Sequence, residues 1–315
     1  MSRMVVTGGA GFVGSHLCEA LLERGDSVIA IDNLSTSLGD NVEHLRDRAD
    51  FELVIADVVD GLPVTGKVDG VLHLASPASP PEYLAMPLET LDVSSIGTRH
   101  ALDLARANDA PFLLASTSEV YGDPEVHPQT EQYNGNVNSV GVRAVYDEAK
   151  RFAETLTMTY HRLHGLPTRI VRIFNTYGPR LRPADGRVVS NFLVQAIAGE
   201  PLTIYGKGTQ TRSFCYVDDE VRGILALFDS EIIEPVNIGN PIEYTMLELA
   251  VMVCEVAGTD CELAFESLPA DDPPRRQPDI TTARQKLGWE PKIELREGLE
   301  RTLAWYVEER ARGRA

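Results

Sequence analysis

Short apolar runs rich in β-branched residues alternate with longer stretches of helical periodicity through the first half of the chain. Strands that alternate with helices in this way are typical of a parallel sheet with helices on both faces. The pattern therefore predicts an α/β fold with a doubly wound parallel sheet. The predicted strands are residues 4–7, 27–32, 51–56, 70–75, 111–116 and 169–174.

The alternation breaks after Phe174, where a stretch rich in Pro, Gly and Arg begins. Helices are predicted further along, over residues 245–257 and 295–311. A change of rhythm of this kind indicates a second, smaller C-terminal domain that binds a substrate beside the sheet. The predicted domains are residues 1–175, joined by part of 215–240, and most of 176–315.

The chain is acidic, and this limits its partners. Its 315 residues include 47 Asp and Glu against 29 Lys and Arg, a formal net charge of −18. Such a charge repels nucleic acid and anionic membranes, so neither is expected as a partner. If the ligand is an anion, its site must therefore be locally basic.

Cysteine and histidine positions give no sign of a disulfide or a metal site. The cysteines contain no CxxC pair, which predicts neither disulfides nor zinc and favours a cytoplasmic protein. His161 and His164 are three apart on a predicted helix, but no third ligand accompanies them, so no metal is expected. The start of the chain shows no leader peptide. The four cysteines are Cys18, Cys215, Cys254 and Cys261.

The segment TGGAGFVGS, residues 7–15, lies between the first predicted strand and a helix. Gly8, Gly11 and Gly14 would allow a tight turn and let backbone N–H groups approach a pyrophosphate. Asp32 closes the second strand 18 residues after Gly14, where an acid binds the adenosine ribose and repels a 2′-phosphate. The order of strand, glycines, helix and acid predicts a Rossmann-like NAD-binding domain over residues 1–175, rather than a glycine-rich turn with an incidental Asp.

Further cofactor contacts are expected near the same strand ends. Asp57 and Val58, just after the third strand, are candidates for contact with the adenine. For Asp57, an ordinary role as a turn residue is an equally good explanation. The other predicted cofactor residues are Phe12, Val13, Asn33, Leu74 and Ala75.

The segment YDEAKR, residues 146–151, carries a candidate general base. Tyr146 and Lys150 are four apart, so a helix places them on one face. The ammonium of Lys150 and a bound nicotinamide cation would lower the pKa of Tyr146, which suits it to take a proton from a sugar hydroxyl. Without the glycine motif, the pair would have a simpler explanation: Tyr and Lys side chains at this spacing often lie along the surface of an amphipathic helix with no catalytic role.

Hydroxyl and carboxyl groups gather where the fifth predicted strand ends, in ASTSEVYGD, residues 115–123. In a doubly wound sheet, ligands bind beyond the carboxyl ends of the strands. Thr117 can therefore hydrogen-bond a hydroxyl that is being oxidised, with Ser118 and Glu119 further along the same loop. These three residues, with Tyr146 and Lys150, are the predicted catalytic set.

Together these motifs resemble the extended short-chain dehydrogenase/reductase family, in its nucleotide-sugar branch. Within that branch the chain is similar to UDP-glucuronate decarboxylases, also called UDP-xylose synthases, from Met4 to the LGWEP segment at 287–291. Ser118 distinguishes the decarboxylases from the other enzymes of this branch. The similar 4,6-dehydratases carry an Asp at this position, and the epimerases usually lack an acid here altogether. The segments that carry the resemblance are LASPASPPEY (74–83), ASTSEVYGDPEVHPQ (115–129), YDEAKR (146–151), RIFNTYGPR (172–180), DGRVVSNF (185–192) and QTRSFCYV (210–217).

The resemblance implies a redox-neutral conversion of UDP-glucuronate to UDP-xylose and CO₂ with NAD as the cofactor. Tyr146 would take the proton of the sugar 4-hydroxyl while the hydride on C4 leaves for NAD⁺. The β-keto acid then loses CO₂ into an enolate that Thr117 and Tyr146 stabilise. C5 takes a proton through Glu119, Ser118 or a water that they hold, and the hydride returns to C4.

The resemblance also implies residues that bind the UDP part. Arg187, Arg212 and Arg276 match positions that hold the diphosphate or uridine, and guanidinium groups suit phosphate through bidentate contacts. Arg180, by contrast, is expected on the surface. Tyr83 either touches the sugar or packs within its proline-rich turn. The remaining substrate-side positions are Asn175 and Asn191.

One loop departs from the family pattern. Asn134, Ser139 and Val142 stand where the decarboxylases typically carry Trp, Pro and Pro. Because this loop would lie near the active site, its sequence puts tight retention of the keto intermediate in doubt. Some release of the 4-keto pentose is therefore expected beside UDP-xylose.

One further inference and two alternative functions remain at this stage. The helices over residues 88–107 and 146–164 pair across a two-fold axis in this family, which implies a homodimer, although core packing explains their apolar residues too. A nucleotide-sugar 4-epimerase or 4,6-dehydratase is the alternative enzyme. A non-catalytic NAD-binding scaffold is the alternative outside enzymes, because fold alone does not prove function.

Overall fold

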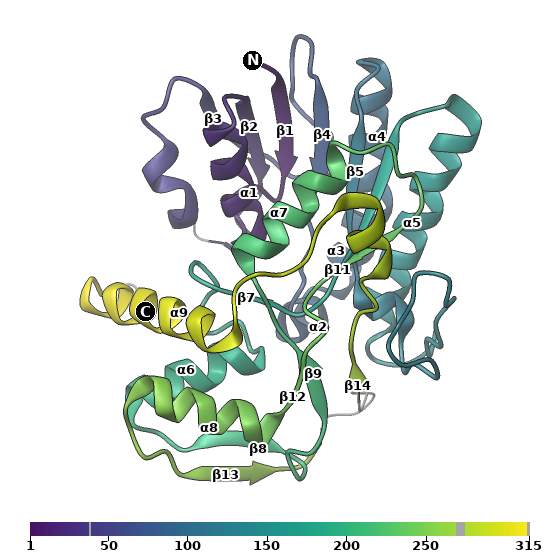
Figure 1. The fold of residues 1–315 in the computed structure, drawn as a ribbon. Helices are drawn as coiled ribbons and strands as arrows, with labels where there is room; N and C mark the ends of the chain where they lie inside the picture. The colour runs from purple at the N-terminus through teal and green to yellow at the C-terminus, as the bar shows by residue number, and fades with distance from the viewer. Residues whose placement is uncertain (38, 269–274, 314–315) are drawn as a thin grey trace.

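Seven parallel strands form one sheet at the centre of the molecule (Figure 1). The computed structural model describes residues 1–37, 39–268 and 275–313. Six of the strands lie where the sequence predicts them, which confirms the doubly wound sheet. Across the sheet the order is β11 (Val236–Ile238), β6 (Thr168–Ile173), β5 (Phe112–Thr117), β4 (Gly70–His73), β1 (Arg3–Thr7), β2 (Ser27–Asp32) and β3 (Phe51–Ile55).

Helices bury both faces of this sheet. Successive side chains of a strand point to opposite faces, so Val5 of β1 packs into the core on one side and Val6 into the core on the other. This two-sided burial explains why the strands are continuous apolar runs. One face carries α1 (Phe12–Glu23) and α7 (Val217–Phe228); the other carries α3 (Pro87–Asp92), the short π-helix η2 (Val93–Gly97), α4 (Thr98–Ala107) and α5 (Ala144–His164).

The strand order reverses at the middle of the sheet. β1 pairs with β2 on one side and with β4 on the other, and the chain builds outward from each of these pairs in opposite directions. A crevice therefore opens beyond the carboxyl ends of β1 and β4, where doubly wound folds bind their ligands.

The seventh strand, β11, is absent from the sequence prediction. It is only three residues long, too short to show a period, and it pairs in parallel with β6. The chain reaches it through α7, so residues 217–238 return to the sheet after an excursion into the C-terminal region. The predicted division into two domains stays a prediction.

The C-terminal elements lie below the sheet in Figure 1 and form small separate sheets and helices. Helices α8 and α9 agree with the predicted helices, and α8 begins with a capping box between Thr245 and Glu248. The C-terminal elements are β7 (Thr176–Tyr177), α6 (Val188–Ala198), β8 (Leu202–Tyr205), β9 (Thr211–Ser213), β10 (Cys215–Tyr216), β12 (Glu243–Thr245), α8 (Met246–Ala257), β13 (Leu263–Glu266), β14 (Arg275–Arg276), η4 (Ala283–Leu287) and α9 (Leu295–Ala311). The first half of the chain adds three short helices, η1 (Asp40–Leu45), α2 (Pro80–Ala85) and η3 (Ser118–Tyr121).

The cysteines differ from the prediction in one respect. Cys254 at the end of α8 and Cys261 before β13 form a disulfide, so the expectation of no disulfide is wrong. The spacing of the two residues gave no sign of it, because the left-handed turn at Gly258 that brings them together depends on how α8 ends. Cys18 and Cys215 are free and buried.

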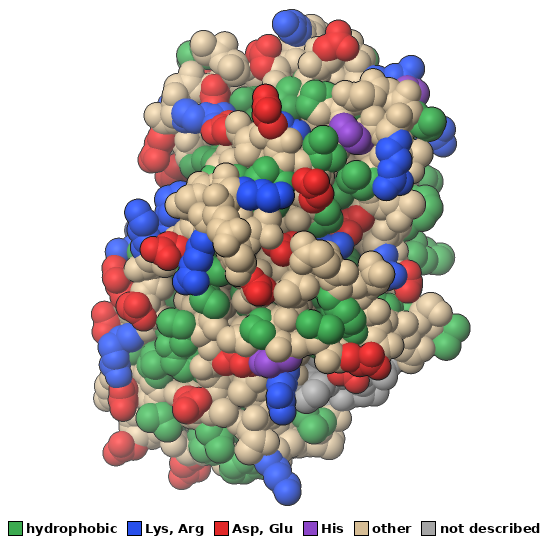
Figure 2. Space-filling view, turned by 45° about the vertical axis from the view of Figure 1, so that its right-hand side comes forward, with side chains coloured by type: hydrophobic (Ala, Val, Ile, Leu, Met, Phe, Trp, Pro, Cys, Tyr) green, Lys and Arg blue, Asp and Glu red, His purple; other side chains and the backbone are tan. Residues whose placement is uncertain are grey.

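Charged side chains of both signs cover the surface. Figure 2 shows acidic and basic side chains intermixed on one face, with no continuous field of Lys and Arg there. None of the helices in the described part of the chain is long and apolar enough to span a bilayer.

Candidate active site

A cavity of about 760 Å³ opens beyond the carboxyl ends of the central strands. Its sheet-side wall contains the glycine loop after β1, Asp32 at the end of β2 and Thr117 at the end of β5. The opposite wall includes Arg212 of β9 and Arg276 of β14. The cavity therefore lies between the sheet and the C-terminal elements, at the reversal of the strand order.

The glycine loop approaches its neighbours too closely for side chains. Gly8 has a φ of +69°, and a Cβ there would lie 2.8 Å from the backbone nitrogen of Ala75. A Cβ on Gly14 would overlap the carbonyl oxygen of Gly8 and lie 3.0 Å from the Cα of Gly9. The first turn of α1 can therefore pack against β1 only with glycine at these positions, which leaves the backbone open to a phosphate.

Asp32 holds this loop from the end of β2. Its carboxylate accepts hydrogen bonds from the backbone N–H groups of Ala10 at 3.0 Å and Leu34 at 2.9 Å. Burial raises the pKa of Asp32, and these N–H groups oppose the rise because they favour the charged form. Asp32 also lines the cavity, at the end of β2 where the sequence predicts the ribose.

The other predicted cofactor residues line the same end of the cavity. Asn33 donates a hydrogen bond of 2.8 Å to the Asp57 carboxylate, and Asp57 also accepts from the N–H of Val59, as a turn residue does. The close-packed glycine cradle and the acid at the end of β2 fit a dinucleotide. The remaining predicted residues on this wall are Gly11, Phe12, Val13, Val58, Leu74 and Ala75.

Tyr146 and Lys150 lie on the buried face of α5, and both line the cavity. Lys150 donates from its Nζ to the carbonyl of Ala115 at 3.0 Å, and its Nζ lies 5.8 Å from the centre of the Tyr146 ring. The hydroxyl of Thr117 lies near Tyr146 and favours its charged form. The ring of Tyr83 stacks on that of Tyr146, with centroids 5.0 Å apart and an interplanar angle of 6°.

The electrostatic environment of Tyr146 differs from the prediction. Burial, followed by the negative charge of Glu119, raises the pKa of Tyr146, while the Thr117 hydrogen bond and Arg187 oppose the rise. Burial also lowers the pKa of Lys150 to about 8. The prediction that Lys150 lowers the pKa of Tyr146 is therefore wrong for the protein by itself, because desolvation dominates both groups.

Glu119 is held between two arginines. Its carboxylate pairs with Arg143 at 2.5 Å and with Arg276 at 3.1 Å. Burial alone would raise the pKa of Glu119, but Arg276 and Arg143 outweigh it and lower the pKa to about 2. In the resting protein Glu119 is a carboxylate and carries no proton. Arg143 is absent from the sequence prediction, although it lies one helical turn before Tyr146.

The residue after Tyr146 is a second unpredicted member of this cluster. Asp147 is 7% exposed and shares a hydrogen bond with Glu119. Burial, followed by the charge of Glu119 and this hydrogen bond, raises the pKa of Asp147 to about 8, against the opposing effect of Arg143. Of the two carboxyl groups, Asp147 is therefore the one whose neutral form is favoured.

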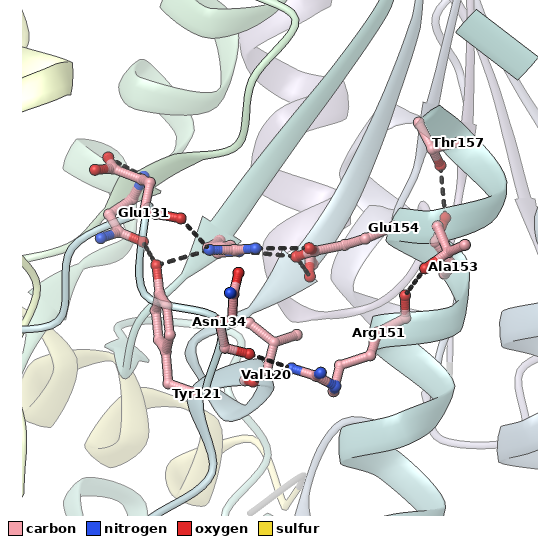
Figure 3. A network of polar contacts seen from close by, with 12 residues as sticks. Val120, Tyr121, Glu131, Asn134, Arg151, Ala153, Glu154 and Thr157 are labelled. Carbon is pink, nitrogen blue, oxygen red and sulfur yellow. Dashed lines mark hydrogen bonds and ion pairs between the residues drawn. The ribbon is translucent and has the colours of Figure 1, made fainter. Parts of the chain in front are cut away.

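A network of polar contacts behind the cavity supports the turn that carries Glu119 (Figure 3). Arg172 of β6 forms a bidentate pair with Glu154 of α5, at 2.9 and 2.8 Å, and donates to the hydroxyl of Tyr121 at 3.0 Å. Tyr121 in turn donates to Asn237 of β11 at 2.7 Å. The turn η3 is thus joined to the two neighbouring strands β6 and β11.

The loop that departs from the family pattern is fixed by backbone contacts. Arg151 donates to the carbonyls of Val120 at 3.0 Å and Asn134 at 2.7 Å, as Figure 3 shows. The N–H of Asn136 donates to the carbonyl of Tyr121 at 3.0 Å. The loop is therefore joined to η3 before it reaches Arg143 at the start of α5.

The predicted substrate residues surround the other end of the cavity. Arg187 forms a bidentate pair with Asp185, at 2.5 and 2.8 Å, whereas Arg276 faces Glu119. Tyr83 packs behind Tyr146 and does not reach the described lining, and its buried hydroxyl has no protein partner. The other predicted residues in the lining are Asn175, Asn191, Arg212 and Ser118.

Arg180 is not a surface residue, so that expectation is wrong. It lines the cavity and pairs with Glu19 of α1 at 2.7 Å.

Metal-binding groups do not converge here or elsewhere in the described ranges: no three His, Cys, Asp or Glu side chains are arranged to hold an ion.

The chain is similar in sequence and fold to known nucleotide-sugar enzymes. A family model described as GDP-mannose 4,6 dehydratase matches residues 5–302. A UDP-glucuronic acid 4-epimerase from Bacillus cereus, solved with UDP-glucuronic acid and NAD, is 29% identical, with a TM-score of 0.88 over 97% of this chain and 99% of the other. A UDP-glucose 4-epimerase from Thermotoga maritima is 30% identical, with a TM-score of 0.90 over 97% and 99%. The chain belongs to the extended short-chain dehydrogenase/reductase family.

Curated relatives narrow this assignment. UDP-glucuronic acid decarboxylase 4 of Arabidopsis thaliana is 54% identical over 94% of this chain and 67% of its own length. UDP-glucuronic acid decarboxylase 1 of Xenopus tropicalis is 51% identical over 98% of this chain and 72% of its own length. Within the extended family, the chain therefore falls among the UDP-glucuronic acid decarboxylases.

Proposed function

We propose that this protein decarboxylates UDP-glucuronate to UDP-xylose with bound NAD, and that the overall reaction is redox-neutral. The observation that carries the proposal is one cavity in which Thr117, Ser118 and Glu119 lie beside Tyr146, next to a dinucleotide cradle. The relatives named as UDP-glucuronic acid decarboxylases support it. A non-catalytic scaffold would need none of these side chains.

When bound, NAD would supply a reversible hydride acceptor for C4 of the sugar. The glycine loop from Gly8 to Gly14 would hold its pyrophosphate at the start of α1. Asp32 would hold the adenosine ribose and disfavour a 2′-phosphate, so the cofactor is NAD rather than NADP. Asn33 and Asp57 would lie beside the adenine.

The reaction begins with proton removal by Tyr146. Burial keeps Tyr146 protonated in the protein by itself, and the positive charge of bound NAD⁺ would favour its phenolate; a sugar 4-hydroxyl placed beside Tyr146 and Thr117 can then pass its proton to that phenolate as C4 is oxidised. The ketone formed is β to the C6 carboxylate, and the C5–C6 bond then breaks with release of CO₂. Thr117 and Tyr146 donate hydrogen bonds to the enolate oxygen left behind.

The far end of the cavity would hold the nucleotide part of the substrate. Arg187 and Arg212 would bind the diphosphate, with Asn175 and Asn191 as hydrogen-bond partners of the sugar nucleotide. Arg276 lies beside Glu119, close to the reacting carbons in this scheme. Tyr83 would support Tyr146 from behind by stacking.

The test is incubation with NAD⁺ and UDP-glucuronate, followed by the mass of the sugar nucleotide and the absorbance of NADH. We expect the mass loss of CO₂, UDP-xylose as the main product with some 4-keto pentose, and no net reduction of NAD over many turnovers. A 4-epimerase would leave the mass unchanged and a dehydratase would release water. NADH that accumulates in step with CO₂ would contradict the redox-neutral reaction.

We further propose that the protein is a homodimer through α3 and α5. Large apolar side chains are exposed there, among them Leu88 at 69% and Phe152 at 52%, and the two helices pack side by side. Phe152→Glu is expected to shift the protein to a monomer in analytical ultracentrifugation, because a charge would be buried at the contact. Val251→Glu, at an exposed site of α8, is the matched control. A wild-type protein that sediments as a monomer contradicts the proposal.

The cytoplasm is the proposed location. The low density of cysteines and the two free buried thiols, Cys18 and Cys215, favour a reducing compartment. The disulfide between Cys254 and Cys261 is the observation that opposes it.

A further inference from the structure

The short helix α2 lies between the helix that carries Tyr146 and the segment that carries Arg187. On one side, its buried Tyr83 stacks on Tyr146 of α5, with ring centroids 5.0 Å apart. On the other side, its Pro81 approaches the turn before α6, because a Cβ added to Gly186 would lie 2.7 Å from Cγ of Pro81. Helix α2 therefore contacts both the proposed general base and the proposed diphosphate-binding segment.

An ion pair joins α2 to this turn. Glu82 of α2 pairs with Arg182, which lies between β7 and α6. Both residues line the cavity, yet 38% of the Arg182 side chain and 15% of the Glu82 side chain are exposed. A side chain that lines a cavity and also reaches solvent lies at its mouth. The pair therefore spans the mouth between α2 and the C-terminal elements.

The Arg182 end of the pair is fixed to the C-terminal elements. The carbonyl of Leu181 accepts a hydrogen bond of 2.8 Å from the hydroxyl of Tyr306 in α9, and the N–H of Asp185 donates to the carbonyl of Arg182 at 3.1 Å. Within the described ranges, no side chain of α2 other than Glu82 forms an ion pair or hydrogen bond with these elements. The ion pair is thus the polar connection that holds α2 to the far wall.

A connection of this kind can open and close. Because solvent screens partly exposed charges, such an ion pair shifts an equilibrium by only about two- to fivefold. It favours the closed mouth without locking it, so substrate can enter and product can leave. The closed pair also neutralises the Glu82 carboxylate, which would otherwise repel an anionic nucleotide sugar at the entrance.

The proposed reaction is sensitive to such a mouth because its intermediate can leave. Once C4 has been oxidised and CO₂ lost, the 4-keto pentose either regains the hydride at C4 or escapes from the cavity. Escape leaves CO₂, the nucleotide of the 4-keto pentose and NADH as products. The proton lost from the 4-hydroxyl is matched by the proton that C5 gains, so no net proton is exchanged. Opening of the mouth therefore changes the products but not the steps that precede escape.

We propose that the ion pair between Glu82 and Arg182 latches the mouth of the cavity and sets the fraction of the 4-keto pentose that escapes before it is reduced. In this scheme neither side chain contacts the reacting carbons. Glu82 is a positioning residue that acts by holding α2 against the C-terminal elements. The inference rests on the proposed decarboxylation.

The experiment removes each charge in turn, with Glu82→Gln and Arg182→Gln, and supplies NAD⁺ and UDP-glucuronate in excess. Mass spectrometry gives the ratio of 4-keto pentose to UDP-xylose, and absorbance gives the NADH left behind. Both variants should raise this ratio about two- to fivefold, the shift expected for a partly exposed pair, with a matching rise in NADH. The rate of CO₂ formation should not fall, because Tyr146 and Thr117 are unchanged.

Two further variants show whether the pair itself is responsible. Glu82→Arg combined with Arg182→Glu reverses the pair and should restore the wild-type ratio. Arg296→Gln is the matched control, because it breaks a similarly exposed pair between Arg296 of α9 and Glu255 of α8, neither of which is in the described lining of the cavity. This control should leave the ratio unchanged.

The wild-type protein allows a second measurement. Raising the ionic strength from about 0.05 M to about 0.5 M shortens the range of exposed charges. The escaping fraction of the wild type should therefore rise toward that of Arg182→Gln, whereas Arg182→Gln itself should respond little. An equal response of the two proteins would contradict the latch.

Other results would also overturn the inference. An unchanged product ratio in both single variants would show that the pair does not control escape. A raised ratio that the reversed pair failed to restore would mean that one of the side chains acts on the substrate by itself. A fall in CO₂ formation would mean that α2 had disturbed Tyr146 rather than the mouth. A wild-type protein that forms neither pentose would overturn the proposed function as well, whereas the first three results would overturn this inference alone.

Discussion

Tyr146→Phe is expected to lower kcat by at least about 10²-fold while binding of UDP-sugars persists. The substitution removes only the phenolic oxygen, the group proposed to accept the proton of the 4-hydroxyl. The ring that stacks on Tyr83 stays, so the shape of the cavity should not change. Turnover is measured by chromatography of the sugar nucleotides, and binding by titration calorimetry with UDP-xylose.

Tyr160→Phe is the control for this variant. Tyr160 lies on the same helix, is also buried, and donates from its hydroxyl to Asp103 at 2.8 Å. The Tyr160→Phe change also removes a phenolic oxygen, but at a position away from the cavity, so kcat should stay near the wild-type value. If Tyr146→Phe retained wild-type turnover, Tyr146 could not be the group that accepts the proton of the 4-hydroxyl.

Gly14→Ala is expected to abolish NAD binding and to destabilise the fold by about 3 kcal/mol or more. The added Cβ would overlap the carbonyl oxygen of Gly8 and press on the Cα of Gly9. Both neighbours are backbone atoms of the turn between β1 and α1, so no side chain can rotate away. Thermal unfolding gives the stability, and a titration with NAD⁺ gives the affinity.

Gly11→Ala provides a graded comparison for the same loop. A Cβ at Gly11 would meet only the carbonyl oxygen of Gly8, at 3.2 Å. A shift of a few tenths of an ångström relieves that contact, so the losses should be much smaller. A Gly14→Ala protein that melted and bound NAD⁺ like the wild type would show that the packing of α1 against β1 is looser than described.

The strands of the sheet were predictable from the sequence because burial on both faces makes them uninterrupted apolar runs. Strand β11 was not predictable, because its three residues, Val236–Ile238, are too few to show a pattern of hydrophobic and polar positions. Its place beside β6 depends on Tyr121 and Asn237, whose hydrogen bond joins segments distant in the chain. Short edge strands of this kind are set by tertiary contacts rather than by local pattern.

The glycine loop and the pair Tyr146 and Lys150 were also predictable, because their spacing reflects turn and helix geometry. Arg143 and Asp147 were not. They flank Tyr146 in the sequence as an ordinary basic and acidic residue of a helix start, and only the approach of Glu119 from η3 gives them a common site. The direction of the Tyr146 pKa shift was predicted wrongly for a related reason: sequence shows charges but not desolvation.

The late return of the chain to β11 affects the order of events during synthesis. Strand β6 is an open edge, with unpaired N–H and C=O groups, until residues 236–238 have left the ribosome. Meanwhile Tyr121 and Arg172 lack the Asn237 partner that completes their network. Because the excursion between β6 and β11 also contains α6 and β8 to β10, the nascent chain must hold a nearly complete sheet exposed while those elements emerge. The pairing along this edge can therefore be completed only after most of the chain has been synthesised.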